Sequence, residues 1–197
     1  MKNCCETPAH PSIESHRKNT TIALIGNPNS GKTTLFNQLT GSRQRTGNWP
    51  GVTVEKKYGY FLDSGKNYQL IDLPGTYSLS LGHSSSDEQI ARQYVKQHSD
   101  ITFINIVDAS TLEKSLYLTS QLREQGVNII ILLNMMDMAA KLNLSIDIEQ
   151  LSQKFNCPVI PIALNKNKDL SVLYKTLHSF QFAQSSLIIQ YEKSIED

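Results

Sequence analysis

The chain has 197 residues, 39% of them hydrophobic and 19% charged, and its formal net charge is +1. This length and composition predict one globular domain with a well-buried core. The small net charge gives no overall attraction to nucleic acid, so no nucleic-acid partner is expected. No apolar stretch reaches the ~20 residues that a membrane-spanning helix needs, and the N-terminus lacks a signal-peptide core. We therefore expect a soluble cytoplasmic domain.

Residues 1–19 are polar and are expected to form a disordered extension. The chain has three cysteines, and the adjacent pair Cys4 and Cys5 in this segment does not indicate a disulfide framework. A metal site formed by this pair and the nearby histidines is an alternative, but the spacing fits no standard zinc pattern. Cys157, which precedes a proline, is predicted to be a small buried apolar group.

The first predicted strand, Thr21–Ile25, runs directly into Gly-Asn-Pro-Asn-Ser-Gly-Lys-Thr at 26–33. This segment fits the pattern G-x-x-x-x-G-K-[ST], and a helix is predicted for Lys32–Leu39. A strand, a glycine-rich loop and a helix start are the setting of a phosphate-binding loop. Lys32 is expected to reach the β- and γ-phosphates of a nucleotide, and the Thr33 hydroxyl to hold Mg²⁺. The predicted phosphate-binding residues are Gly26, Asn27, Pro28, Asn29, Ser30, Gly31, Lys32, Thr33 and Thr34.

Residues 41–53 are polar, contain glycine and proline, and are predicted to form a long loop. The end of this loop, formed by Gly51, Val52 and Thr53, is assigned to the nucleotide site. The Thr53 hydroxyl can bind Mg²⁺ only when the loop folds over the γ-phosphate, which predicts an ordered state with triphosphate and a loose state without it. For Trp49, shielding of the site and simple packing are equal alternatives.

A hairpin is predicted next, with strands at Val54–Leu62 and Tyr68–Leu73. The second strand ends where nucleotide sites form in open α/β sheets. The Asp72 carboxylate is expected to reach Mg²⁺ directly or through water, and the Gly75 amide to contact the γ-phosphate. The segment assigned to the nucleotide is Asp72, Leu73, Pro74 and Gly75, and residues 76–86 are predicted to form a second polar loop.

The rest of the chain alternates helices with nearly continuous apolar strands, which are typical of strands covered on both faces. We predict helices at Asp87–Gln97, Leu112–Gln125, Ile146–Phe155 and Leu170–Phe180, and strands at Ile101–Val107, Asn128–Leu133 and Val159–Ile162. The fold class is therefore α/β, a mostly parallel six-stranded sheet with helices on both faces and one antiparallel hairpin pair. Asp108 is expected to cap a helix, and His98 and His178 to lie at the surface.

The segment Asn134-Met135-Met136-Asp137 follows a buried strand and is predicted to bind the base of the nucleotide. The Asp137 carboxylate can accept two hydrogen bonds from guanine, whereas adenine offers no such pair of donors. Asn134 belongs to the same motif, and the Met135 thioether could cover the base. The backbone of Ile162, Ala163 and Leu164 is assigned to the base oxygen.

The stretches GNPNSGKTTLFNQLTGSRQRTGNWPGVTVE, DLPGTYSL, VDASTLEKSLYLT and NMMD resemble the N-terminal GTPase domain of the FeoB family of bacterial ferrous-iron transporters. The resemblance covers about residues 20–180 and implies a Ras-like P-loop GTPase fold. It further implies a GTPase domain at 20–182 and the start of a linker or helical spacer at 183–197. A membrane permease domain of the same full-length protein is the implied partner. The domain is then expected on the cytoplasmic face of the bacterial inner membrane, and its self-association stays open.

The same resemblance implies slow, K⁺-stimulated hydrolysis of GTP to GDP and phosphate. The water-positioning glutamine of Ras-like GTPases is absent, since Thr76 follows Gly75. Asn29 is the implied K⁺ ligand, helped by backbone carbonyls near 48–51. The catalytic assignments are Asn29, Lys32, Thr53 and Gly75, and the metal ligands are Thr33, Thr53 and Asp72 for Mg²⁺ and Asn29 for K⁺.

One departure from the family concerns the base-contacting loop. The family often has serine or threonine near residues 163–165, where this chain has Ala163-Leu164-Asn165, so base affinity is the property affected. Three alternatives stay open. One is a nucleotide-sensing regulatory docking module with negligible turnover, another is an unrelated ATPase, and in the third Arg43 or Arg45 acts as a catalytic arginine finger. No metal beyond Mg²⁺ and K⁺ is expected.

Overall fold

A computed structural model of the chain describes residues 19–41, 43–80, 85–166 and 169–179. The predicted N-terminal extension, apart from residue 19, and the predicted linker at 183–197 lie outside these residues. No helix in the described ranges is both long enough and apolar enough to span a bilayer.

A seven-stranded sheet in the order β2-β3-β4-β1-β5-β6-β7 forms the centre of the molecule. The strands are β1 (Thr20–Gly26), β2 (Gln44–Asn48), β3 (Glu55–Asp63), β4 (Lys66–Asp72), β5 (Thr102–Asp108), β6 (Asn128–Asn134) and β7 (Val159–Pro161). β4, β1, β5, β6 and β7 are parallel neighbours, whereas β3 pairs antiparallel with both β4 and β2. The prediction of a mostly parallel sheet with an antiparallel hairpin pair is confirmed.

The prediction of six strands is wrong by one strand, because part of the predicted loop 41–53 forms β2. Gln44–Asn48 pairs antiparallel with β3, from Gln44 opposite Gly59 to Asn48 opposite Glu55. All five residues of β2 are exposed. A strand at the edge of a sheet with no buried face has no alternating hydrophobic pattern, so the sequence carried no signal for it.

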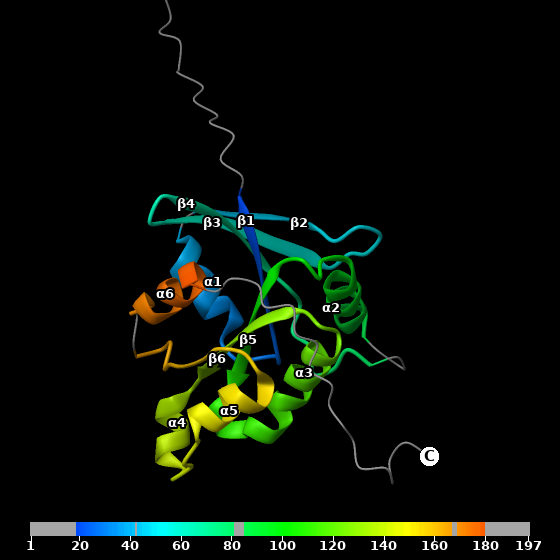
Figure 1. Cartoon of the computed structure of the whole chain (residues 1–197). Helices are drawn as coiled ribbons and strands as arrows, with labels where there is room; N and C mark the ends of the chain where they lie inside the picture. Colours follow the sequence, from blue (N-terminus) through cyan, green and yellow to red (C-terminus); the bar gives the residue numbers. More distant parts are fainter. Residues whose placement is uncertain (1–18, 42, 81–84, 167–168, 180–197) are drawn as a thin grey trace, which may run out of the picture.

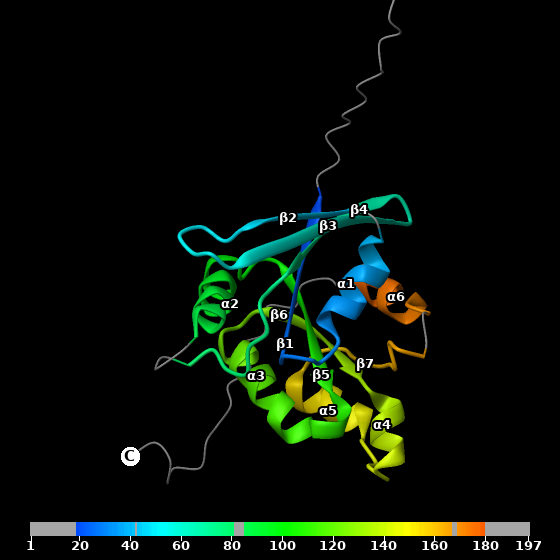
Figure 2. The same ribbon diagram turned by 180° about the vertical axis from the view of Figure 1, so that it is seen from behind.

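Helices cover both faces of the sheet (Figures 1 and 2). They are α1 (Lys32–Thr40), α2 (Ser86–Gln97), α3 (Leu112–Glu124), α4 (Met136–Lys141), α5 (Ile148–Phe155) and α6 (Ser171–Ser179), with a 3₁₀ turn at Ala109–Thr111. Alternate residues of β1 face opposite sides: Ile22 and Leu24 pack with α1 and α6, and Ala23 and Ile25 with α2 and α3. The short helix α4 was not predicted. Its six residues are fewer than a periodic pattern needs to be recognised.

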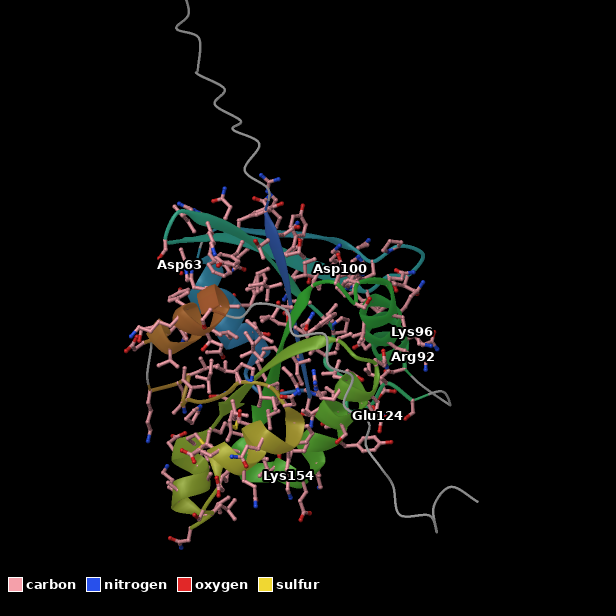
Figure 3. The ribbon with its side chains drawn as sticks, in the orientation of Figure 1. Asp63, Arg92, Lys96, Asp100, Glu124 and Lys154 are labelled. Atoms are coloured by element: carbon pink, nitrogen blue, oxygen red, sulfur yellow. The ribbon has the colours of Figure 1, made fainter. Side chains whose placement is uncertain are left out.

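Two expectations about single polar residues have different outcomes. Asp108 caps the 3₁₀ turn as predicted, because its carboxylate accepts a hydrogen bond from the Ser110 amide at 2.8 Å. His98 and His178 are half-buried, which corrects their placement at the surface. His178 pairs with Asp63, the last residue of β3, which is labelled in Figure 3. His98 stacks on Tyr94 with the ring centres 4.0 Å apart.

Candidate functional site

The segment from Gly26 to Thr33 connects the end of β1 to the start of α1. A Cβ atom at Gly26 would lie 2.4 Å from the Ile106 carbonyl oxygen, so this position admits only glycine. Gly31 has a φ of 108°, and a Cβ there would lie 2.4 Å from Nδ2 of Asn134. Backbone freedom and the absence of a side chain therefore let the loop close tightly against β5 and β6.

The first turn of α1 lies open at this loop. Gly31 is its N-cap and supplies no side-chain hydrogen bond, and no acidic residue occupies the first turn. The side chains of Thr33 and Thr34 are exposed. Free backbone N–H groups at a helix start, together with the helix dipole, attract an anion.

Lys32 lies across the loop rather than in solvent. Its side chain is buried, and Nζ donates hydrogen bonds to the carbonyl oxygens of Gly26 at 3.0 Å and Asn27 at 2.9 Å. Burial lowers the pKa of Lys32, and the charge of Asp72 partly opposes this lowering. The ammonium group is thus fixed at the loop before any ligand arrives.

A cavity of about 400 Å³ joins the phosphate-binding loop to the end of β4. β4 pairs with β1, with Asp72 opposite Leu24, and this pairing places the carboxylate beside the loop. Of the predicted residues, the cavity is lined by Pro28, Asn29, Lys32, Thr33, Asp72, Leu73, Pro74 and Gly75. The site therefore joins two segments that are far apart in the sequence.

Asp72 and Gly75 form the wall opposite the loop. Burial raises the pKa of Asp72 to about 6, although the charges of Lys32 and Lys57 lower it, and Oδ1 is buried without a hydrogen-bond partner. A Cβ at Gly75 would lie 3.2 Å from the Lys32 Nζ atom. The backbone at Gly75 therefore comes close to the ammonium group, where a terminal phosphate would have to fit.

The Thr76 hydroxyl, which stands after Gly75, is directed to the backbone. Thr76 is 1% exposed, and its Oγ1 donates a hydrogen bond to the Ser78 carbonyl oxygen at 2.7 Å. Its amide donates to the Gly26 carbonyl oxygen at 3.2 Å. Thr76 thus fixes the backbone beside the loop and has no hydroxyl proton left to orient a water molecule.

The loop segment 49–53 is not at the cavity. Thr53 and its neighbours Gly51 and Val52 are exposed and do not line it, and neither do residues 48–50. Trp49 is 6% exposed and contacts Tyr94 of α2 edge-on, with ring centres 5.5 Å apart. The Lys56 ammonium lies over its ring at 4.8 Å. In this structure Trp49 therefore packs against α2, and the predicted role of Thr53 requires this loop to move.

Asn134 connects the phosphate-binding loop to the last loop of the site. It is 4% exposed, its Nδ2 donates to the Ser30 carbonyl oxygen at 2.8 Å, and its Oδ1 accepts from the Leu164 amide at 3.0 Å. The Met136 amide also donates to the Ile162 carbonyl oxygen at 3.2 Å. The predicted base-binding segments 134–137 and 162–164 are thus neighbours held by hydrogen bonds.

Asp137 lies in the first turn of α4, which begins after Met135 in the left-handed conformation with a φ of 62°. Its Oδ2 is 3.1 Å from Nζ of Lys166, and its side chain is 12% exposed. The hydrogen bond from Lys166 is the main cause that lowers the pKa of Asp137.

Two lysines at the site were not predicted from the sequence. Lys57 lines the cavity and lies directly opposite Asp72 in the antiparallel pairing of β3 and β4. The register of the predicted hairpin would have identified it. Lys166 follows the predicted base-contacting segment by two residues, and only its position after this segment could have suggested it.

The donor set at the cavity suits a magnesium ion. A threonine hydroxyl at residue 33 and the buried, unpartnered carboxylate oxygen of Asp72 are oxygen ligands of the kind that Mg²⁺ takes. Of the predicted K⁺ ligands, Asn29 lines the cavity, whereas residues 48–51 do not. No group of three or more His, Cys, Asp or Glu side chains suited to a metal ion occurs among the described residues.

A larger cavity of about 610 Å³ lies between α2 and the sheet, with Trp49, Pro50, Tyr94 and His98 in its walls. It contains none of the phosphate-binding loop. Its size therefore does not make it the nucleotide site, since the anion-binding features gather at the smaller cavity. Arg43 and Arg45 line neither cavity.

Comparison with known proteins agrees with this geometry. The family model described as ferrous iron transport protein B matches residues 20–177. The chain is 48% identical to the Fe(2+) transporter FeoB of Escherichia coli K12 over 180 residues. The aligned region covers 90% of this chain and 23% of that protein. The chain thus spans about a quarter of the length of the curated relatives it matches.

Two solved structures agree in fold. The cytosolic domain of L. pneumophila FeoB is 46% identical with a TM-score of 0.81, over 90% of this chain and 76% of that chain. The cytosolic domain of the T. maritima FeoB iron transporter in GMPPNP form is 39% identical with a TM-score of 0.80, over 90% and 70% of the two chains. The resemblance seen in the sequence is therefore confirmed: the chain has a P-loop GTPase fold and belongs to the ferrous iron transport protein B (FeoB) family.

Proposed function

We propose that this chain binds guanine nucleotides with Mg²⁺ and hydrolyses GTP slowly, with stimulation by K⁺. The observation that carries the proposal is the convergence of the Lys32 ammonium, the unpartnered Asp72 carboxylate and the Gly75 backbone on one cavity at the start of α1. Related solved structures of the T. maritima FeoB cytosolic domain in GDP and GMPPNP forms support the nucleotide class.

Binding rests on groups that are already in position. The α1 N-terminus and the loop amides would hold the phosphates, and Lys32 would exchange its carbonyl partners for the β- and γ-phosphate oxygens. Thr33 and Asp72 would hold Mg²⁺, which neutralises phosphate charge when bound. Asp137 would accept the two guanine N–H donors.

Hydrolysis would proceed by in-line attack of water on the γ-phosphorus, with the bond to the GDP oxygen breaking and the water proton passing to phosphate. No side-chain base is needed, because catalysis of phosphoryl transfer rests on positioning and on charge stabilisation. The Thr76 hydroxyl is committed to the Ser78 carbonyl, which supports a slow intrinsic rate. The Asn29 side chain would hold K⁺, which adds positive charge at the phosphates.

Two measurements test the nucleotide class and the reaction. Titration calorimetry should show GTP and GDP binding, with ATP weaker by on the order of 100-fold, because adenine leaves the Asp137 carboxylate without its partners. Equal affinity for ATP and GTP would refute the base assignment. GTP turnover should be faster in KCl than in NaCl, and Asn29→Ala should remove that difference.

The second candidate is a nucleotide-sensing docking module with negligible turnover. The engaged Thr76 hydroxyl favours it, since Thr76 has no hydroxyl proton left to position a water molecule beside Gly75. If GTP binds but its turnover is undetectable in both KCl and NaCl, the module is the better description. In either case the full-length protein would be a ferrous iron transporter, with this domain coupled to a membrane permease domain on the cytoplasmic face of the inner membrane.

A further inference from the structure

An exposed lysine lies against the carboxylate assigned to guanine. Lys166 belongs to the loop after β7, and its amide donates to the Ala163 carbonyl oxygen at 2.9 Å, a turn that brings its side chain back to α4. Its Nζ lies 3.1 Å from Oδ2 of Asp137. The Lys166 side chain is 59% exposed and that of Asp137 12% exposed, so the cation covers the carboxylate from the solvent side.

The two oxygens of Asp137 differ in their surroundings. Oδ2 has the lysine, whereas Oδ1 is buried without a hydrogen-bond partner. An ionised carboxylate can accept about four hydrogen bonds, and the unpartnered Oδ1 leaves acceptor capacity for guanine N–H donors. The ion pair is therefore compatible with base binding.

The base-contacting loop offers few other side chains that could hold this carboxylate. Ala163 and Leu164 have no polar side-chain atoms, and the Leu164 amide is already bonded to Asn134. The ammonium group of Lys166 is the side-chain donor from this loop that reaches the Asp137 carboxylate.

We propose that Lys166 is a positioning residue for guanine recognition, which holds the Asp137 carboxylate in the orientation that the base needs. The inference rests on the proposed function and names a specificity determinant of the same site. Lys166 does not touch the reacting phosphates and is not a catalytic residue. It acts through Asp137.

Protonation of Asp137 gives this role a distinctive signature. A protonated carboxyl group would present an O–H donor to guanine, which itself offers donors at this edge, so affinity would fall. Lys166 is the charged group that lowers the pKa of Asp137, and the backbone amides of Asp137 and Met138 add to the lowering. Without the lysine the carboxyl group therefore becomes protonated at a higher pH.

The test compares Lys166→Met and Lys166→Arg with the wild-type chain by titration of fluorescently labelled GDP. Lys154→Met is the matched control, because Lys154 is an exposed lysine of α5 (Figure 3). At pH 7.5 and low salt, Lys166→Met should weaken GDP binding about two- to fivefold, as expected for a solvent-exposed ion pair. Lys166→Arg and Lys154→Met should stay within about 1.5-fold, and high salt should reduce the deficit of Lys166→Met.

A pH series separates positioning from a merely structural effect. Between pH 7.5 and 3.5 the deficit of Lys166→Met relative to wild type should grow, mainly below about pH 4.5, where an ordinary aspartate begins to protonate. Titrations shared by both proteins cancel in the ratio. In an Asp137→Asn background the change Lys166→Met should have almost no effect, since no carboxylate is left to hold. Equal pH profiles, or an undiminished effect in the Asp137→Asn background, would overturn the inference.

Failure of this inference and failure of the proposed function give different results. If the wild-type chain does not bind GDP, the proposed function is wrong. If it binds GDP and Asp137→Asn weakens that binding, but Lys166→Met matches wild type at every pH, only the role of Lys166 is refuted. Because Lys166 is 59% exposed, thermal melting of Lys166→Met should match wild type, so the binding data would not reflect unfolding.

Discussion

Asn134 is expected to contribute more to the stability of the nucleotide-free protein than to direct contact with the base. Replacing it by alanine removes the bond to the Ser30 carbonyl oxygen at 2.8 Å and the bond from the Leu164 amide at 3.0 Å. Each buried polar group left unsatisfied costs about 1–3 kcal/mol. Asn134→Ala should therefore lower the free energy of unfolding by about 2–6 kcal/mol, and the melting temperature by about 4–24 °C for a domain of this size.

Urea denaturation of the nucleotide-free chain measures this loss directly. Asn37→Ala is the control, since Asn37 is exposed on α1 and its side chain accepts one exposed hydrogen bond, from Gln44 at 2.9 Å. Its free energy of unfolding should stay within about 0.5 kcal/mol of wild type. A loss below 0.5 kcal/mol for Asn134→Ala would refute the bridging role and leave Asn134 as a base ligand only.

Three further outcomes follow from the cavity and its loop. Lys32→Met should weaken triphosphate binding on the order of 100-fold in calorimetry, because charge-assisted hydrogen bonds to phosphate are lost; near wild-type affinity would exclude the phosphate-binding role. The raised pKa of Asp72 means that the folded state favours the protonated carboxyl group. The protonated group's contribution to stability is therefore fully present below the unfolded-state pKa of 3.8 and is lost as the pH rises through the folded-state pKa of about 6. Asp72→Asn should therefore stabilise the nucleotide-free chain at pH 8, on the order of 2–3 kcal/mol, but not at pH 3.5, and equal urea midpoints of the two proteins at pH 8 would contradict this. Trp49 is the single tryptophan of the chain, so its fluorescence reports on this loop. If GMPPNP and Mg²⁺ draw the loop away from Tyr94, the Trp49 emission should shift to longer wavelength with GMPPNP but not with GDP. Identical spectra with the two nucleotides would show that the loop stays on Tyr94.

The parts of the fold that were predicted correctly have strong local patterns. The run that became β6 is apolar and fully buried apart from its first residue, as expected for a strand between two covered neighbours. The glycines at 26 and 31 were predicted from spacing, and the structure shows that a Cβ would clash with the Ile106 carbonyl oxygen at Gly26 and with the Asn134 side chain at Gly31. Spacing is informative here because it reflects the close approach of neighbouring atoms to the loop backbone.

The parts that were missed depend on contacts between distant segments. β2 exists only because residues 44–48 meet the free edge of β3, and its exposed side chains leave no pattern in the sequence. The pairing of Lys166 with Asp137 requires the turn at Ala163 and the left-handed residue that begins α4. The packing of Trp49 on α2 depends on where the loop lies, which local sequence does not determine.

The two ends of the candidate site differ in how complete they are before a nucleotide binds. Asn134 joins the phosphate loop to the base side by two hydrogen bonds, and the pairing of β4 with β1 places Asp72 beside the loop. In contrast, Thr53 is exposed and its loop is anchored to α2 through Trp49. A ligand can shift a conformational equilibrium only by its difference in affinity for the two states. On the proposed function, GDP and GTP share the prepared end, and only the γ-phosphate can engage Gly75 and draw in Thr53. The portion of the site that distinguishes the two nucleotides is therefore the portion that must move, and the packing of Trp49 on Tyr94 opposes that movement.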